Sequence, residues 1–95
     1  MREVIITSSF KKDYKRLKRS ARYNMDELQK VVEQLSISIL PLAQKYRDHS
    51  LTGNLNYCRE CHIRPDWLFI YRLDENDLVL VRTGSHSDLS NLQNG

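Results

Sequence analysis

The segment YCRECHIRPDWLFIYRLDENDLVLVRTG, residues 57–84, contains three short runs rich in β-branched, aromatic and other apolar residues. Pro65 and Asp66 separate the first run from the second, and the polar sequence DEND at residues 74–77 separates the second from the third. Proline and clusters of Asp and Asn interrupt strands and favour turns. The pattern therefore predicts an antiparallel meander of three strands, over residues 57–63, 67–73 and 78–84.

The residues before this meander predict one strand and a hairpin of two helices. REVIIT, residues 2–7, is short and β-branched, as strands often are. A hydroxyl from residues 7–9 can cap the helix that follows, and a second helix is expected from Asn24 to just before Pro41, because proline cannot continue helical hydrogen bonding. The apolar stripe expected on the first helix consists of Phe10, Tyr14, Leu17 and Ala21. The buried face expected on the second consists of Met25, Leu28, Val31, Val32, Leu35 and Ile39.

The order of these elements predicts a single α+β domain over residues 1–95. An N-terminal strand and a two-helix hairpin precede the antiparallel meander, whose one face the helices cover, and a short helical turn follows in SHSDLSNLQNG. No run of about 18 apolar residues is present, and the first residues, MREVIITSSFKK, lack the long apolar stretch of a signal peptide. We therefore expect a globular cytoplasmic protein with no membrane partner.

The positive charge is concentrated near the N-terminus. Residues 1–22 contain eight Lys and Arg against two Asp and Glu, while the remaining residues contain seven against ten. Such a basic segment favours a polyanionic partner such as RNA or the ribosome, although a well-solvated helix face would show the same pattern. The basic residues around the apolar stripe are Lys11, Lys12, Lys15, Arg16, Lys18, Arg19 and Arg22.

The sequence CRECH at residues 58–62 matches the Cys-x-x-Cys-His pattern of haem attachment, and Cys-x-x-Cys also occurs in zinc and redox sites. Side chains alternate between the two faces of a strand, so Cys58 and Cys61, three positions apart, should point to opposite faces. A zinc site built on these cysteines would need two more ligands, and the chain has no second cysteine pair. Two free thiols packed beside a sheet are therefore expected, with no haem, no metal and no other cofactor.

The three histidines of the chain stand at the ends of predicted strands or among polar neighbours. They are His49 in RDHSL, His62 in CHIRPDW and His86 in TGSHSDL, and Asp66 follows the turn beside His62. In a meander these positions can gather along one edge of the sheet. Imidazole exchanges protons near neutral pH, so three converging histidines and a carboxylate would form a general acid–base site.

Three blocks of the sequence resemble the YafQ branch of the RelE-type bacterial toxins. These are RDHSLTG at residues 47–53, YCRECHIRPDWLFIYRL at 57–73 and RTGSHSDL at 82–89. The resemblance implies a RelE-like toxin of a type II toxin–antitoxin pair, an mRNA endoribonuclease that typically cuts at the ribosomal A site and is silenced by a cognate antitoxin. It implies catalytic roles for His49, His62, Asp66 and His86, and a part in activity for Trp67. The family commonly has an aromatic residue where this chain has Ser90.

RNA carries its own nucleophile, the ribose 2′-hydroxyl, so cleavage without a metal needs a base, an acid and cations for the phosphorane charge. We expect His62 and His86 to transfer protons, with His49 as a phosphate contact or alternate acid, and Asp66 to orient a histidine or act as base. Arg59 and Arg82 are candidates for phosphate stabilisation, with solvated strand charges as the alternative, and core packing is the alternative for Trp67. A module that binds RNA or the ribosome without catalysis is the second hypothesis.

Overall fold

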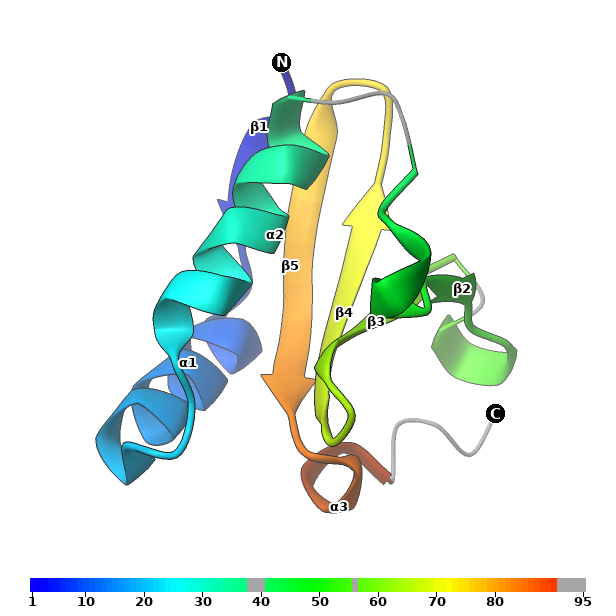
Figure 1. Ribbon diagram of the computed structural model, residues 1–95. Helices are drawn as coiled ribbons and strands as arrows, with labels where there is room; N and C mark the ends of the chain where they lie inside the picture. Colours follow the sequence, from blue (N-terminus) through cyan, green and yellow to red (C-terminus); the bar gives the residue numbers. More distant parts are fainter. Residues whose placement is uncertain (38–40, 56, 91–95) are drawn as a thin grey trace.

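The chain folds into one mixed β-sheet with two long helices over one of its faces (Figure 1). The computed structural model describes residues 1–37, 41–55 and 57–90. The sheet has five strands in the order β1-β5-β4-β3-β2. The strands are β1 (Glu3–Ile6), β2 (His49–Ser50), β3 (Arg59–Arg64), β4 (Trp67–Leu73) and β5 (Asp77–Gly84). The helices are α1 (Ser8–Ser20), α2 (Met25–Ile37) and α3 (His86–Leu89), with 3₁₀ turns η1 (Gln44–Tyr46) and η2 (Gly53–Leu55).

The predicted antiparallel meander is confirmed. Strand β3 pairs antiparallel with β4, and β4 pairs antiparallel with β5. Strand β1 then pairs parallel with β5, which makes the sheet mixed. The segment expected to be a loop before the meander contains η1, η2 and the short strand β2, which pairs with the free edge of β3.

Both predicted helices are present, and local capping sets the start of α1. The Thr7 hydroxyl accepts a hydrogen bond from the backbone N–H of Phe10 at 3.0 Å, which satisfies a donor that the first helical turn leaves unpaired. The prediction that Ala21 continues the apolar stripe is wrong, because Ala21 is exposed in a left-handed conformation at the end of α1. Ile39, expected on the buried face of α2, lies outside the described residues.

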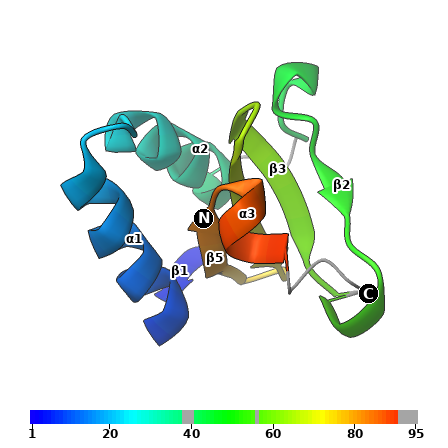
Figure 2. The same ribbon diagram turned by 90° about the horizontal axis from the view of Figure 1, so that it is seen from below.

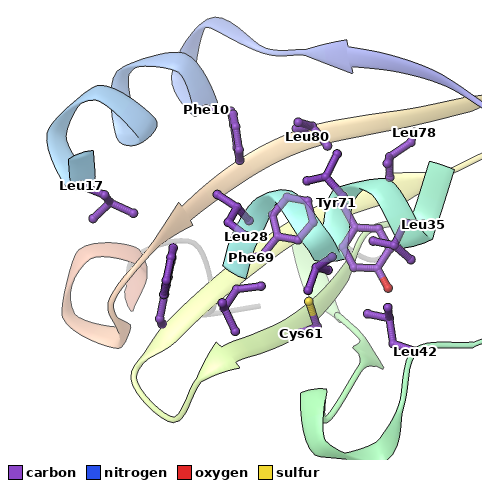
Figure 3. Packing of buried hydrophobic residues seen from close by; sticks show 14 residues of the cluster. Phe10, Leu17, Leu28, Leu35, Leu42, Cys61, Phe69, Tyr71, Leu78 and Leu80 are labelled. Carbon is purple, nitrogen blue, oxygen red and sulfur yellow. The ribbon is translucent and has the colours of Figure 1, made fainter. Parts of the chain in front are cut away.

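The larger hydrophobic core lies between the helices and the sheet (Figure 3). Phe10 of α1 packs against Phe69 of β4 with ring centroids 5.9 Å apart. Cys61 belongs to this core, whereas Cys58 lies in a smaller cluster with Leu89 of α3. Both cysteines are free and buried, and burial raises the pKa of each thiol. The predicted separation of the two thiols onto opposite faces is therefore confirmed.

Helix α3 follows the end of β5, and Figure 2, seen from below, shows it between α1 and β3. The Ser85 hydroxyl accepts from the Asp88 backbone N–H, and the Asp88 carboxylate accepts from the Ser85 backbone N–H. This reciprocal capping box fixes where the helix begins. The predicted short helical turn after the meander is confirmed, and its first residue is His86.

Candidate functional site

The structure brings the three histidines together in one row. His49 lies on β2, His62 on β3 and His86 at the start of α3. The ring centroids of His49 and His62 are 6.2 Å apart, and those of His62 and His86 are 5.6 Å apart. Residues 37 positions apart in the sequence therefore share one patch of surface, at the end of the sheet where the predicted acid–base residues were expected to meet.

Strand register explains how these side chains meet. Alternation along β3 puts Cys61 and Ile63 into the core beneath the helices, so Glu60 and His62 point to the opposite face. His49 is the cross-strand partner of Glu60, and directly opposed residues of antiparallel strands share a face. His62 is opposite Leu68 on β4, and Leu68 is opposite Gly84 on β5, two residues before His86.

Asp66 holds His86 through two hydrogen bonds. One Asp66 carboxylate oxygen lies 2.6 Å from His86 Nδ1 and accepts the His86 backbone N–H at 2.9 Å. These bonds, the backbone bond first, lower the pKa of Asp66, and the nearby Arg22 adds to the effect. Asp66 is therefore a carboxylate at neutral pH. That charge suits it to orient the imidazole, because a carboxylate accepts but cannot donate a hydrogen bond.

Glu60 is part of the site and was missed by the sequence analysis. Its side chain is buried at 5% exposure, and its Oε1 lies 3.4 Å from His49 Nε2. The signal was its position two residues before His62, which puts both residues on one face of β3. An acidic residue in the middle of a buried strand is uncommon unless it has a specific partner.

Two residues expected to contact substrate have structural partners instead. Trp67 is only 2% exposed, and its indole N–H donates to Thr83 Oγ1 at 3.0 Å. Arg82 reaches α1, where its guanidinium donates to both carboxylate oxygens of the buried Asp13, at 2.6 and 3.1 Å. This geometry favours core packing for Trp67 and an ion pair between helix and sheet for Arg82, neither of which the strand pattern could indicate.

Arg59 lies near the histidine row, and its guanidinium already has hydrogen-bond partners. It lies next to Glu60 on β3 and donates to both oxygens of Asp48, at 3.2 and 3.3 Å, and to Ser50 Oγ at 2.8 Å. Asp48 also accepts the Tyr71 hydroxyl at 2.6 Å. These bonds anchor the segment that carries His49. The guanidinium remains partly exposed, with 39% of its side-chain surface accessible.

The basic residues of α1 and of the segment just after it face outward. All six residues expected to contact RNA or the ribosome are exposed, namely Lys11, Lys12, Lys15, Lys18, Arg19 and Arg22. Arg16 is partly engaged, since it pairs with Asp13 and with Asp88 of α3. Arg22 lies beside the site, because it lines a cavity of about 370 Å³ together with Arg64, Asp66 and Trp67. The basic surface therefore extends to the catalytic candidates.

Among the helices in the described part of the chain, none combines the length and apolar character that crossing a membrane requires.

The chain is similar to bacterial toxins over nearly its whole length. A family model described as the bacterial toxin of type II toxin–antitoxin system, YafQ, matches residues 2–91. The mRNA interferase toxin YafQ of Escherichia coli strain K12 is 34% identical over 88 residues, covering 93% of this chain and 95% of the relative. Its crystal structure in the DinJ–YafQ complex superposes with a TM-score of 0.84 at 34% identity, covering 94% and 98% of the two chains. A metal-bound toxin from Helicobacter pylori superposes equally well, with a TM-score of 0.84 at 44% identity, covering 94% and 99%. The match in sequence and in fold establishes that this chain belongs to the YafQ family of type II toxin–antitoxin toxins.

Proposed function

We propose that this chain is a toxin that cleaves mRNA as a metal-independent endoribonuclease, by general acid–base catalysis. The single observation that carries the proposal is the row of three imidazoles, with His86 oriented by the Asp66 carboxylate at 2.6 Å. Membership of the YafQ family supports it, because the E. coli relative is an mRNA interferase.

The proposed reaction uses the ribose 2′-hydroxyl as nucleophile. One imidazole takes the proton of that hydroxyl as its oxygen attacks the adjacent phosphorus, and another gives a proton to the departing 5′-oxygen. His62 and His86 form this pair, with rings 5.6 Å apart, and His49 extends the row as a phosphate contact or alternate acid. The products are a 2′,3′-cyclic phosphate and a 5′-hydroxyl, and no water or metal enters this step.

Cations at the rim of the site would offset the charge that builds up on the phosphate. Arg22 and Arg64 line the cavity beside Asp66, and Arg64 keeps 66% of its side-chain surface exposed although it pairs with Glu27. Arg59, next to Glu60, is a third candidate. We assign the exposed lysines and arginines of α1 to the phosphates of RNA, and in the cell to the ribosome, because phosphate contacts fix position without reading bases.

The proposed partner is a cognate antitoxin, and the proposed compartment is the cytoplasm, where mRNA is translated. The E. coli relative is found in a complex with DinJ. A basic toxin surface suits an inhibitor with acidic segments, which would cover the face that RNA needs.

Cleavage of a defined mRNA by the purified chain in the presence of EDTA tests the proposal, with and without ribosomes. We expect cleavage with cyclic or 3′-phosphate ends, and loss of cleavage in His86→Ala at unchanged fold. Fragments with 3′-hydroxyl ends would contradict the mechanism. RNA binding without any cleavage would support the non-catalytic module, which would have no need of the histidine row.

A further inference from the structure

We propose that Arg16 is a positioning residue for His86, and that it acts through Asp88 rather than by contact with RNA. Arg16 belongs to the basic surface of α1, yet its guanidinium is paired on two sides, with Asp13 and with Asp88, at 3.2 Å each. The effect on the position of His86 follows from these contacts, whereas the effect on cleavage rests on the proposed function.

Helix α3 is too short to hold its own first turn in place. It contains four residues, His86–Leu89, and isolated helices shorter than about 12–15 residues are marginal in water. Its last residue, Leu89, is fully buried in a cluster with Cys58 and Leu68. The end that carries His86 is exposed and has no such apolar anchor. Its position therefore depends on polar contacts with other elements.

Two aspartates hold consecutive backbone N–H groups at this end of α3. Asp66 accepts the backbone N–H of His86 at 2.9 Å. Asp88 Oδ2 accepts the backbone N–H of Ser85 at 3.1 Å, and the same oxygen accepts from Arg16 Nη2 at 3.2 Å. Asp66 lies in the turn between β3 and β4, whereas Arg16 lies on α1. The start of α3 is therefore held from two directions, and Arg16 provides one of them.

The other side of the Arg16 guanidinium is fixed by a buried carboxylate. Arg16 Nη1 donates to Asp13 at 3.2 Å, and Asp13 is 2% exposed. Asp13 also accepts from Arg82 and from the backbone N–H of Thr83, at 2.6 and 3.1 Å. Charges of opposite sign therefore alternate from β5 through α1 to α3. A bridge between two carboxylates suits arginine, whose nitrogens form a rigid fork, better than the single ammonium of lysine.

The space for this ion pair depends on Gly84, the last residue of β5. A Cβ atom at that position would lie 2.9 Å from Asp88 Oδ2 and 3.2 Å from Arg16 Nη2. Contacts this close would push the two side chains away, so the pair and the end of β5 fit together because residue 84 has no side chain. The pair is therefore packed directly against the segment that leads into His86.

The consequence is expected for the rate of cleavage rather than for stability. The side chains of Arg16 and Asp88 keep 49% and 37% of their surface exposed, and exposed ion pairs contribute little to folding. Catalysis is more sensitive to position, since a misplacement of about 1 Å can slow a reaction about 10²-fold. Loss of the pair should therefore slow cleavage in a chain that still folds.

The cleavage test compares Arg16→Gln, Asp88→Asn and the double variant with Lys30→Gln, which removes one charge from an exposed position of α2. Asparagine keeps an oxygen that can accept the Ser85 N–H, so Asp88→Asn removes mainly the charge that Arg16 meets. Single-turnover cleavage at saturating RNA should fall about tenfold in each single variant, less than the 10²-fold of a full misplacement. Lys30→Gln should cleave as the parent does, and the RNA concentration for half-maximal rate should change little in any variant.

The double variant should be no slower than the slower single variant, because both changes break one contact. Arg16→Lys keeps the charge but not the fork, so its rate should stay reduced. Multiplying losses in the double variant, or parental cleavage by Asp88→Asn, would overturn the positioning role. So would a loss in Arg16→Gln that is confined to RNA affinity and restored in Arg16→Lys, because that result would identify a phosphate contact.

A second measurement does not depend on activity. The backbone amide signals of Ser85 and His86 are followed by NMR in Arg16→Gln and in Lys30→Gln. We expect both signals to shift, and hydrogen exchange of the Ser85 amide to become several-fold faster, in Arg16→Gln alone. Unchanged amides in that variant would overturn the placement. The two proposals fail separately: altered amides in a chain whose parent cleaves no RNA contradict the proposed function only, whereas parental cleavage by Arg16→Gln contradicts only the positioning role.

Discussion

One oxygen of the Asp66 carboxylate is bonded to both the ring and the backbone of His86, at 2.6 and 2.9 Å, although the two residues are 20 positions apart. The bond to the backbone N–H ties the first residue of α3 to the turn between β3 and β4. The bond to Nδ1 leaves Nε2 as the nitrogen that can act on a substrate. A single side chain therefore sets both where the histidine stands and which of its nitrogens is available.

Replacing Asp66 with Asn should slow RNA cleavage by about 10²-fold or more, a typical contribution of a positioned acid or base. The amide has no charge and allows a different imidazole tautomer. Stability should change little, because the Asp66 side chain is 71% exposed. Single-turnover cleavage rates and urea unfolding measure the two effects. Equal rates in the variant and the parent would exclude a positioning role.

The Asp66 carboxyl should titrate below the ordinary value of about 3.9, since hydrogen bonds from His86 lower its pKa in the folded state. The folded state stabilises the charged carboxylate, so protonation of Asp66 lowers the stability of the fold. The contribution to folding is fully present above pH ~3.9 and is lost as the pH falls through the lowered value. NMR titration of the side-chain carboxyl carbon measures this. In His86→Ala the midpoint should move upward only in part, because the backbone N–H of residue 86 still donates to Asp66. An unchanged midpoint would show that the backbone bond, and not the imidazole, lowers the pKa.

Asp13→Asn should destabilise the fold by about 2–4 kcal/mol, because it breaks a buried ion pair and weakens its hydrogen bonds. Asp13 is 2% exposed and accepts from Arg82 and from the Thr83 backbone N–H. Urea denaturation gives the free energy of unfolding. The matched control is Glu33→Gln, an exposed position on α2, which should change stability by less than about 0.5 kcal/mol. Similar values for both variants would show that this pair does not anchor α1.

Changing Lys12, Lys15 and Lys18 together to Gln should weaken binding to RNA or ribosomes and flatten its salt dependence. Each lost phosphate contact removes somewhat less than one unit from the slope of log affinity against log salt. These residues are exposed on α1, and Arg22 is left in place because it lines the cavity beside Asp66. Ribosome co-sedimentation over a salt series measures the change, with His86→Ala as the control that should still bind. An unaltered slope would show that these lysines do not contact RNA phosphates and instead face solvent or the antitoxin.

Trp67→Phe should cost roughly 1–2 kcal/mol of stability and leave the cleavage rate near that of the parent. The indole N–H loses its bond to Thr83 Oγ1, while that hydroxyl keeps its own bond to the Leu68 carbonyl oxygen. Thermal unfolding and cleavage at a temperature where both proteins are folded separate the two readouts. A large loss of activity at unchanged stability would instead indicate that Trp67 contacts the substrate.

The sequence by itself indicated both long helices, the N-terminal strand and the three strands of the meander, together with the candidate imidazoles of the site. Short-range signals such as the turn at Pro65 and Asp66, the periodicity around Leu17 and the alternation that separates Cys58 from Cys61 act over a few residues. They can therefore be recognised from a short segment, without knowledge of the rest of the chain. The same signals placed His62 and His86 near strand ends and His49 in the preceding loop, from which a meander can bring them to one edge.

Only the tertiary structure decided which charges pair. Asp13 and Arg82 are 69 positions apart, and His49 meets Glu60 only because β2 adds to the edge of β3. Such partners depend on how helices and strands pack, and a buried carboxylate looks like any surface acid in the sequence. The parallel pairing of β1 with β5 has the same origin, since hydrogen bonds between strands carry no local sequence signal of their partner. The sequence could name the candidate imidazoles and Asp66, but only packing placed Glu60 beside His49.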